Sequence, residues 1–190
     1  MGKKPPTFNQ RLRRLRPWQQ LAFATALAQR AAPNYLLFSE ATGFGDRETY
    51  SKLLALLWEQ LTAKAASINW AVQQEKLPDL QPHPADFEVY GVYPALDAIM
   101  ALELAVEQAV TQDEETAVRA SKLSRSTVRS YLELQAQGLD PQELMDDENA
   151  FQDELLIQVS SQFQPQPELL KSLKTLAENE GFSNLGISLK

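Results

Sequence analysis

Asp97 is the carboxylate in this sequence with the clearest potential for chemistry, because it lies in an apolar stretch. On a helix, residues three, four and seven positions away share a face; around Asp97 these are Tyr93, Met100, Ala101 and Leu104. Burial among apolar neighbours penalises the charged form of a carboxyl group and shifts its pKa. The sequence therefore predicts a candidate small-molecule pocket, lined by Trp58, Tyr90, Tyr93 and Asp97.

Asp97 also has a structural explanation, which we favour. It falls in the first turn of a helix predicted over 94–110, where the helix dipole stabilises an anion and a tyrosine hydroxyl can satisfy it. Glu103 and Glu107 share a face, but the Glu-x-x-His pairs of metal-binding bundles are missing from the sequence. The only histidine, His83, lies between two prolines and is expected in an exposed loop. We therefore predict no metal site, no cofactor and no catalytic residue.

Two glycines surround a phenylalanine in residues 42–46, TGFGD. A phosphate-binding loop would need a preceding strand and a Gly-Lys-Ser/Thr ending, and the sequence has neither. The pattern instead predicts a corner between two helices. Gly43 would end the first helix, Phe44 would fill the corner, and Asp46 would cap the second helix.

A basic patch near the start contains Arg11, Arg13, Arg14 and Arg16, with Trp18 close by. Arginine grips phosphates and tryptophan stacks on bases, so the patch could bind nucleic acid. The net charge of −7 argues against that partner. Residues 1–39 contain seven Lys and Arg and no acid, whereas the rest of the chain is acidic. We expect the patch to pair with that acidic remainder.

A second basic segment, residues 119–129, could hold phosphate. More simply, it could pair with the acidic segment 140–154 of the same or a neighbouring chain.

The elements that position these residues are predicted to be helices. Residues 94–110 have 16 residues without a breaker after Pro94 and too much apolar surface for a one-sided helix. Further helices are predicted over 17–31, 35–41, 47–65, 113–137 and the region after 151, with Pro33 as a stop. The pattern predicts an all-α, single-domain bundle of about eight or nine helices around the central helix at about 94–110. Residues 1–6 are predicted to be a disordered start, 7–190 one helical domain, and 140–190 a candidate C-terminal subdomain.

The composition of the sequence indicates the cellular compartment of the protein. It has no cysteine, which favours a reducing compartment. We find no apolar segment typical of a secretory signal or a membrane span. These features predict a cytoplasmic protein without membrane contact.

Several short motifs resemble those of the YjaG-like family of bacterial proteins. They are Asn34-Tyr35, residues 42–46, Leu57-Trp58-Glu59, Asp86-Phe87, residues 90–98 around Gly-Val-Tyr-Pro-Ala, and Ser183-Asn184-x-Gly186-Ile187. The resemblance runs from about residue 8 to 187. It implies an all-helical fold and supplies no catalytic residues to carry over.

Two functional hypotheses remain open at this point. The first, which we favour, is a non-enzymatic protein-interaction module, acting as a homodimer or with another protein. The alternative is a small-molecule binding protein or enzyme whose pocket lies near Tyr90, Tyr93, Asp97 and Trp58.

Overall fold

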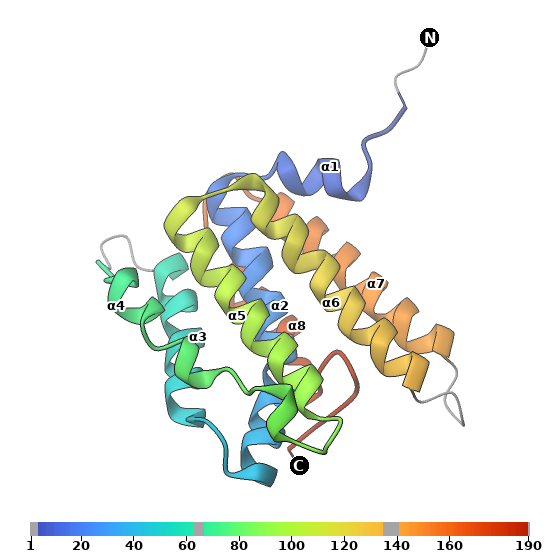
Figure 1. Cartoon of the computed structure of the whole chain (residues 1–190). Coiled ribbons are helices and arrows are strands. Elements are labelled where there is room, and N and C mark those ends of the chain that lie inside the picture. The colour runs from blue at the N-terminus through green and yellow to red at the C-terminus, as the bar shows by residue number, and fades with distance from the viewer. Residues whose placement is uncertain (1–3, 63–66, 135–140, 190) are drawn as a thin grey trace.

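The computed structural model describes residues 4–62, 67–134 and 141–189, and all regular secondary structure within these ranges is helical. The described ranges contain eight α-helices, and Figure 1 shows them packed into one bundle, which confirms the predicted all-α fold. Their bounds are α1 Phe8–Arg13, α2 Pro17–Thr42, α3 Arg47–Thr62, α4 Trp70–Gln74, α5 Val92–Thr111, α6 Glu114–Leu134, α7 Pro141–Ser160 and α8 Pro167–Glu178. Three short 3₁₀ turns, Pro78–Leu80, Pro84–Asp86 and Asn179–Gly181, complete the described elements.

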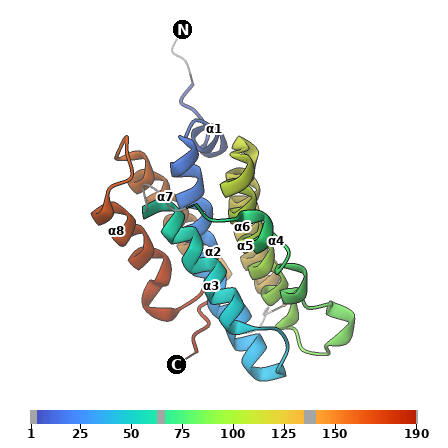
Figure 2. The same cartoon turned by 90° about the vertical axis from the view of Figure 1, so that its left-hand side faces the viewer.

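Helix α2 is the element around which the other long helices pack. It contacts α3, α5, α6, α7 and α8, and in Figure 2 it lies between the α7–α8 pair and the α5–α6 pair. Its alanines are small enough to let neighbouring backbones approach closely; Ala22, Ala24, Ala26 and Ala28 are all fully buried. The helix predicted over 94–110 is present as α5, and its inner face packs on α2. The outer face of α5 is exposed, so the most enclosed position belongs to α2.

The predicted stop at Pro33 is wrong, because α2 continues through it to Thr42. A proline inside a helix loses one hydrogen bond and crowds the preceding turn, at a cost of about 3 kcal/mol. The second half of α2 buries Tyr35 and Phe38. Burying each large apolar side chain contributes roughly 1.5–3 kcal/mol, so tertiary packing outweighs the local penalty.

The corner between α2 and α3 forms as predicted. Gly43 ends α2 in a left-handed conformation with φ 72°. The Asp46 carboxylate accepts hydrogen bonds from the backbone N–H groups of Glu48 and Thr49, which caps α3. Phe44 packs against Phe38 and Phe87 inside the corner.

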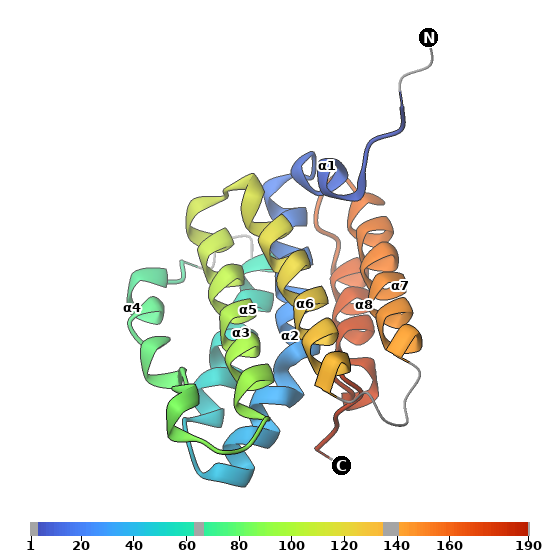
Figure 3. The same cartoon turned by 45° about the vertical axis from the view of Figure 1, so that its right-hand side comes forward.

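The C-terminal third differs from its prediction in where its first helix begins. Helix α7 begins at residue 141, well before the helix predicted in the region after 151. Phe151, Leu155 and Val159 lie on its buried face, whereas Phe163 lies beyond its end and is 63% exposed. After α8, the chain returns to the bundle through buried Ser183, Asn184 and Leu185 (Figure 3). Asp140, part of the predicted 140–190 subdomain, lies outside the described residues.

At the N-terminus, residues 4–6 are exposed and have no regular secondary structure. Residues 1–3 of the predicted disordered start lie outside the described part of the chain. Within that part, none of the helices has the length and apolar character needed to cross a lipid bilayer.

Candidate functional site

Three tyrosines gather beside α5 and α6, the pair of helices that lies in front of α2 in Figure 1. The Tyr90 ring lies 5.7 Å from Tyr93 and 6.3 Å from Tyr131, measured between ring centroids. Tyr93 is 53% exposed and Leu134, one turn beyond Tyr131, is 66% exposed. With Met100, which is two turns along α5 from Tyr93 and also exposed, these side chains form a surface we call the tyrosine face: Tyr90, Tyr93, Met100, Tyr131 and Leu134.

Asp97 lies beside this surface and is half-buried. Its Oδ2 accepts a hydrogen bond of 2.8 Å from the Thr127 hydroxyl of α6. Burial raises the pKa of Asp97 above its ordinary value, and the Thr127 hydrogen bond opposes that shift. Burial also raises the pKa of Tyr90, with a further contribution from the negative charge of Asp97. The structure therefore brings together three of the four predicted pocket residues: Tyr90, Tyr93 and Asp97.

The fourth, Trp58, faces a different neighbour. It is buried on α3, and its indole N–H donates a hydrogen bond of 3.0 Å to the Gln29 side chain of α2. The aromatic residue that completes the cluster is Tyr131, which the sequence analysis did not select. The position of Trp58 assigns it to the α2–α3 contact.

The tyrosine face continues along α5 and α6 as a shallow groove of about 340 Å³. Apolar side chains of Met100, Leu104 and Leu123 line it together with charged Glu103, Glu107 and Arg119. Glu103 accepts a hydrogen bond from the Gln81 side chain, and burial raises its pKa. Glu107 forms an ion pair with Arg119. The groove therefore contains two carboxyl groups from α5, and Asp97 lies outside its lining, next to the tyrosine face.

The predicted basic patch divides into two roles. Arg13 forms an ion pair with Glu115 of α6, which raises the pKa of Arg13 and lowers that of Glu115. The Arg16 guanidinium lies over the Phe163 ring at 3.4 Å. Arg11 and Arg14 are exposed. Pairing between the basic start and the acidic remainder is thus present for Arg13.

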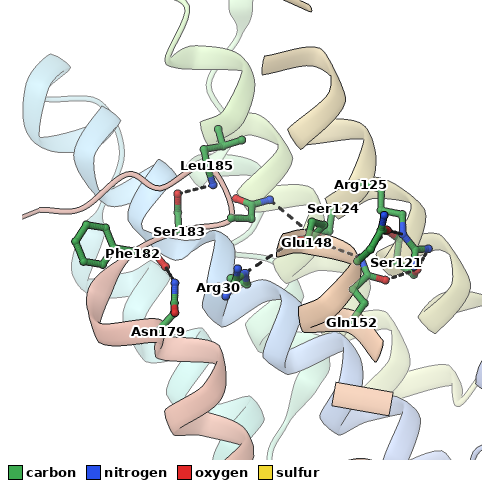
Figure 4. A network of polar contacts seen from close by, with 12 residues as sticks. Arg30, Ser121, Ser124, Arg125, Glu148, Gln152, Asn179, Phe182, Ser183 and Leu185 are labelled. Carbon is green, nitrogen blue, oxygen red and sulfur yellow. Dashed lines mark hydrogen bonds and ion pairs between the residues drawn. The ribbon is translucent and has the colours of Figure 1, made fainter. Parts of the chain in front are cut away.

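The interior contains a polar network that sequence reasoning missed (Figure 4). Glu148 of α7 is fully buried, and its Oε2 lies 3.8 Å from the Nε of buried Arg30 of α2. Its Oε1 accepts hydrogen bonds from the Ser124 hydroxyl and the Gln152 amide. Burial raises the pKa of Glu148, and the nearby guanidinium groups of Arg30 and Arg125 oppose that shift.

This network joins four parts of the chain. Arg125 of α6 donates to Asn149 of α7 and to the Ser121 hydroxyl. Asn34 of α2 donates to Asn184 of the tail at 3.0 Å. Arg125 belongs to the second basic segment, so its predicted pairing with 140–154 takes the form of a hydrogen bond to Asn149. Arg30 Nε, Glu148 Oε2 and Asn34 Oδ1 have no hydrogen-bond partner, whereas the other contacts join separate elements. We therefore assign the network to holding α6, α7 and the tail on α2.

Two further possibilities are a role for the histidine and a metal site. His83 is exposed, as predicted. Across residues 4–62, 67–134 and 141–189, no group of three or more His, Cys, Asp or Glu side chains could hold a metal ion.

Comparison of the sequence with known proteins identifies the family of this chain. Residues 7–188 match the family described as "Protein of unknown function (DUF416)". The chain belongs to the DUF416 family. It is 37% identical over 185 residues to the uncharacterized protein YjaG of Escherichia coli K12, covering 93% of this chain and 94% of that protein. An uncharacterized protein of Haemophilus influenzae is 37% identical over 188 residues, covering 94% and 95% of the two chains.

A solved structure supports the same assignment. The crystal structure of a DUF416 family protein from Shewanella baltica matches with a TM-score of 0.90 and 39% identity, covering 97% of this chain and all of that one. The predicted YjaG-like relationship is confirmed. These relatives establish the family and the helical fold, so a function has to be argued from the site itself.

Proposed function

We propose that this DUF416 protein is a non-enzymatic interaction protein, and that the tyrosine face binds a basic amphipathic segment of a partner protein. The observation that carries the proposal is the gathering of three tyrosines beside the half-buried carboxyl group of Asp97. Tyrosine combines a large apolar ring with a polar hydroxyl and is enriched at the centres of protein interfaces.

The charge around the tyrosine face supports a basic partner. Asp97 lies beside the tyrosine face, and Glu103 and Glu107 line the adjoining groove, where Glu107 is paired with Arg119. An Arg or Lys side chain could lie on a tyrosine ring by a cation–π contact and reach a carboxylate with its charged end. Apolar side chains of the same segment could then pack on Met100 and Leu104. This combination is typical of an amphipathic helix bound in a groove.

Photo-crosslinking tests this proposal. We would place a photoreactive amino acid at Met100 in the full chain and expose it to lysate of a bacterium that contains a family member. The matched control position is Val72 of α4, since Met100 is 40% and Val72 45% exposed. We expect a discrete adduct from position 100 and none from position 72. Mass spectrometry should place the crosslink in a partner segment rich in Lys or Arg.

Tyr93→Ala is expected to weaken binding of that identified partner about 30-fold, because a central interface tyrosine contributes about 2 kcal/mol. Val72→Ala should leave affinity unchanged. Isothermal titration with the crosslinked partner measures both. Equal adducts at positions 100 and 72, or a captured segment without basic residues, would contradict the proposal. An adduct of twice the chain mass would indicate a second copy and would replace the heterologous partner with the predicted homodimer.

A further inference from the structure

The end of the bundle opposite the α2–α3 corner contains a cavity of about 690 Å³, within the range of small-molecule sites, about 300–1,000 Å³. Helices α2 and α8 begin here, and α3 and α5 end here (Figure 2). The cavity is lined by Trp18, Leu21, Gln60, Leu61, Gln108 and Leu170, among others. None of the side chains of the tyrosine face lines it, so the two surfaces are separate.

The wall of this cavity is neutral. None of the described residues that line it has an ionisable side chain, although the chain as a whole has a net charge of −7. Two helix N-termini and two helix C-termini meet here, so their opposite partial charges offset one another. A charged ligand that left water would find no opposite charge among these described lining residues, which favours an uncharged ligand.

Gln108 of α5 provides an unused hydrogen-bond acceptor. The side chain is 1% exposed, and its Nε2 donates to the Gln20 Oε1 at 3.3 Å. The Nε2 of Gln20 donates to the backbone carbonyl of Leu12, which fixes the orientation of the Gln20 amide. Gln108 must therefore use its nitrogen toward Gln20, and its Oε1 has no hydrogen-bond partner. The oxygen is covered by its neighbours, so a ligand N–H could satisfy it after a small shift of the Gln108 side chain toward the cavity.

Gln60 of α3 provides the complementary donor. Its Oε1 accepts a hydrogen bond of 3.1 Å from the Trp70 indole, which directs its Nε2 group away from that bond. Trp18 adds a large aromatic surface, and its own indole N–H is held by the Phe163 carbonyl oxygen at 3.1 Å. The cavity therefore combines a fixed aromatic wall with one amide acceptor and one amide donor.

We propose that this cavity binds a neutral, planar small molecule of the cyclic or aromatic amide class, such as a free nucleobase or nicotinamide. The ligand's N–H would donate to Gln108 Oε1, its carbonyl oxygen would accept from Gln60 Nε2, and its ring would pack against Trp18 and Leu21. A phosphorylated nucleotide would be disfavoured because its charge has no partner among the described residues of the wall.

NMR titration of the full, ¹⁵N-labelled chain tests this inference with uracil and nicotinamide as neutral probes and uridine monophosphate as the charged comparison. At least one neutral probe should shift the side-chain amide signals of Gln60 and Gln108 with a Kd of about 1 mM or tighter. The nucleotide should bind at least tenfold more weakly. Gln108→Met should weaken the neutral probe about fivefold to tenfold through one lost hydrogen bond.

Two further variants keep the test decisive. Ala109→Trp fills the cavity while leaving the Gln108–Gln20 contact in place, and it should abolish binding without lowering the unfolding temperature. Gln29→Met removes a partly buried glutamine outside this cavity and should leave binding unchanged. The inference is overturned if neither neutral probe shifts the Gln60 and Gln108 signals at about 10 mM, if the nucleotide binds as tightly as they do, or if Ala109→Trp binds normally.

Discussion

Glu148→Met is expected to destabilise the fold by about 3–5 kcal/mol, the usual cost of leaving one charge of a buried pair without its partner. Glu148 is fully buried and Arg30 is 8% exposed, so neither side chain can turn to water. Removal of the carboxyl group leaves the Arg30 guanidinium in the interior. Arginine does not give up its proton in proteins, so the charge stays in the interior at every accessible pH, with only the more distant charge of Asp147 to offset it.

The reverse substitution, Arg30→Met, should behave differently because Glu148 can take up a proton. Burial raises the pKa of Glu148 in the folded state, so the folded state binds this proton more tightly than the unfolded chain does. Stability contributed by this group is therefore present at low pH and is lost as pH rises from the unfolded-state pKa through the folded-state pKa. At acidic pH, we expect Arg30→Met to lower the free energy of unfolding less than Glu148→Met does. As the pH rises from there, the Arg30→Met variant should lose stability steadily.

Urea unfolding of both variants, followed by circular dichroism across pH 5 to 8, measures this difference. The control is the exposed ion pair between Arg47 and Glu40, whose charged atoms lie 3.5 Å apart. This pair should contribute less than about 1 kcal/mol to stability. The double variant Arg30→Met with Glu148→Met should be less destabilised than the sum of the single variants. Equal, pH-independent losses for the two single variants would show that the ion pair is not the source of the effect.

Gly45→Ala is expected to cost about 2–4 kcal/mol, from left-handed backbone strain together with a steric clash. The residue has φ +79°, and a Cβ added there would lie 2.1 Å from the Tyr35 hydroxyl oxygen. Tyr35 is fully buried and its ring stacks on Tyr50 at 4.6 Å, so it cannot easily retreat.

Gly43→Ala is the matched control for this prediction. Gly43 has a similar φ of +72°, but an added Cβ would meet no atom within 4 Å. Its cost should therefore be the conformational part alone, about 1 kcal/mol. Thermal unfolding of both variants separates strain from clash. If the Tyr35 hydroxyl causes the clash, Gly45→Ala should cost less stability in a Tyr35→Phe background than in the unmodified chain. Equal losses at positions 43 and 45 would rule out the clash.

Local sequence rules predicted the features of this fold that depend on neighbouring residues. The α2–α3 corner is one case, because Gly43 and Asp46 determine the cap geometry within a few residues of themselves. The helix predicted over 94–110 is another, since it is present as α5, Val92–Thr111.

Features that depend on distant residues were not predictable in the same way. Pro33 is tolerated because of packing from other helices, which no local rule includes. Glu148 lies in a strongly acidic segment, where a solvated side chain is the ordinary expectation. Only the folded chain places it against Arg30, 118 positions earlier in the sequence. The available signal in the sequence was spacing: on a helix, Glu148 and Gln152 share a face with the apolar residues Phe151 and Leu155.

The candidate site shows the same division. Tyr90, Tyr93 and Asp97 lie close in sequence and come together. Tyr131 and Trp58 come from other helices, so helical spacing could not tell which of them would join the cluster. The Gln108 acceptor depends on the orientation of two amides from different helices.

The enclosed position of α2 has a consequence for synthesis on the ribosome. This helix is translated before its partners α5 to α8, which extend from residue 92 to residue 178. A nascent chain therefore exposes the apolar surface of α2 until α5 to α8 have emerged from the ribosome, because these non-local contacts form late in synthesis. Prematurely terminated products should consequently be targets for chaperones and proteases, while the finished polypeptide is not.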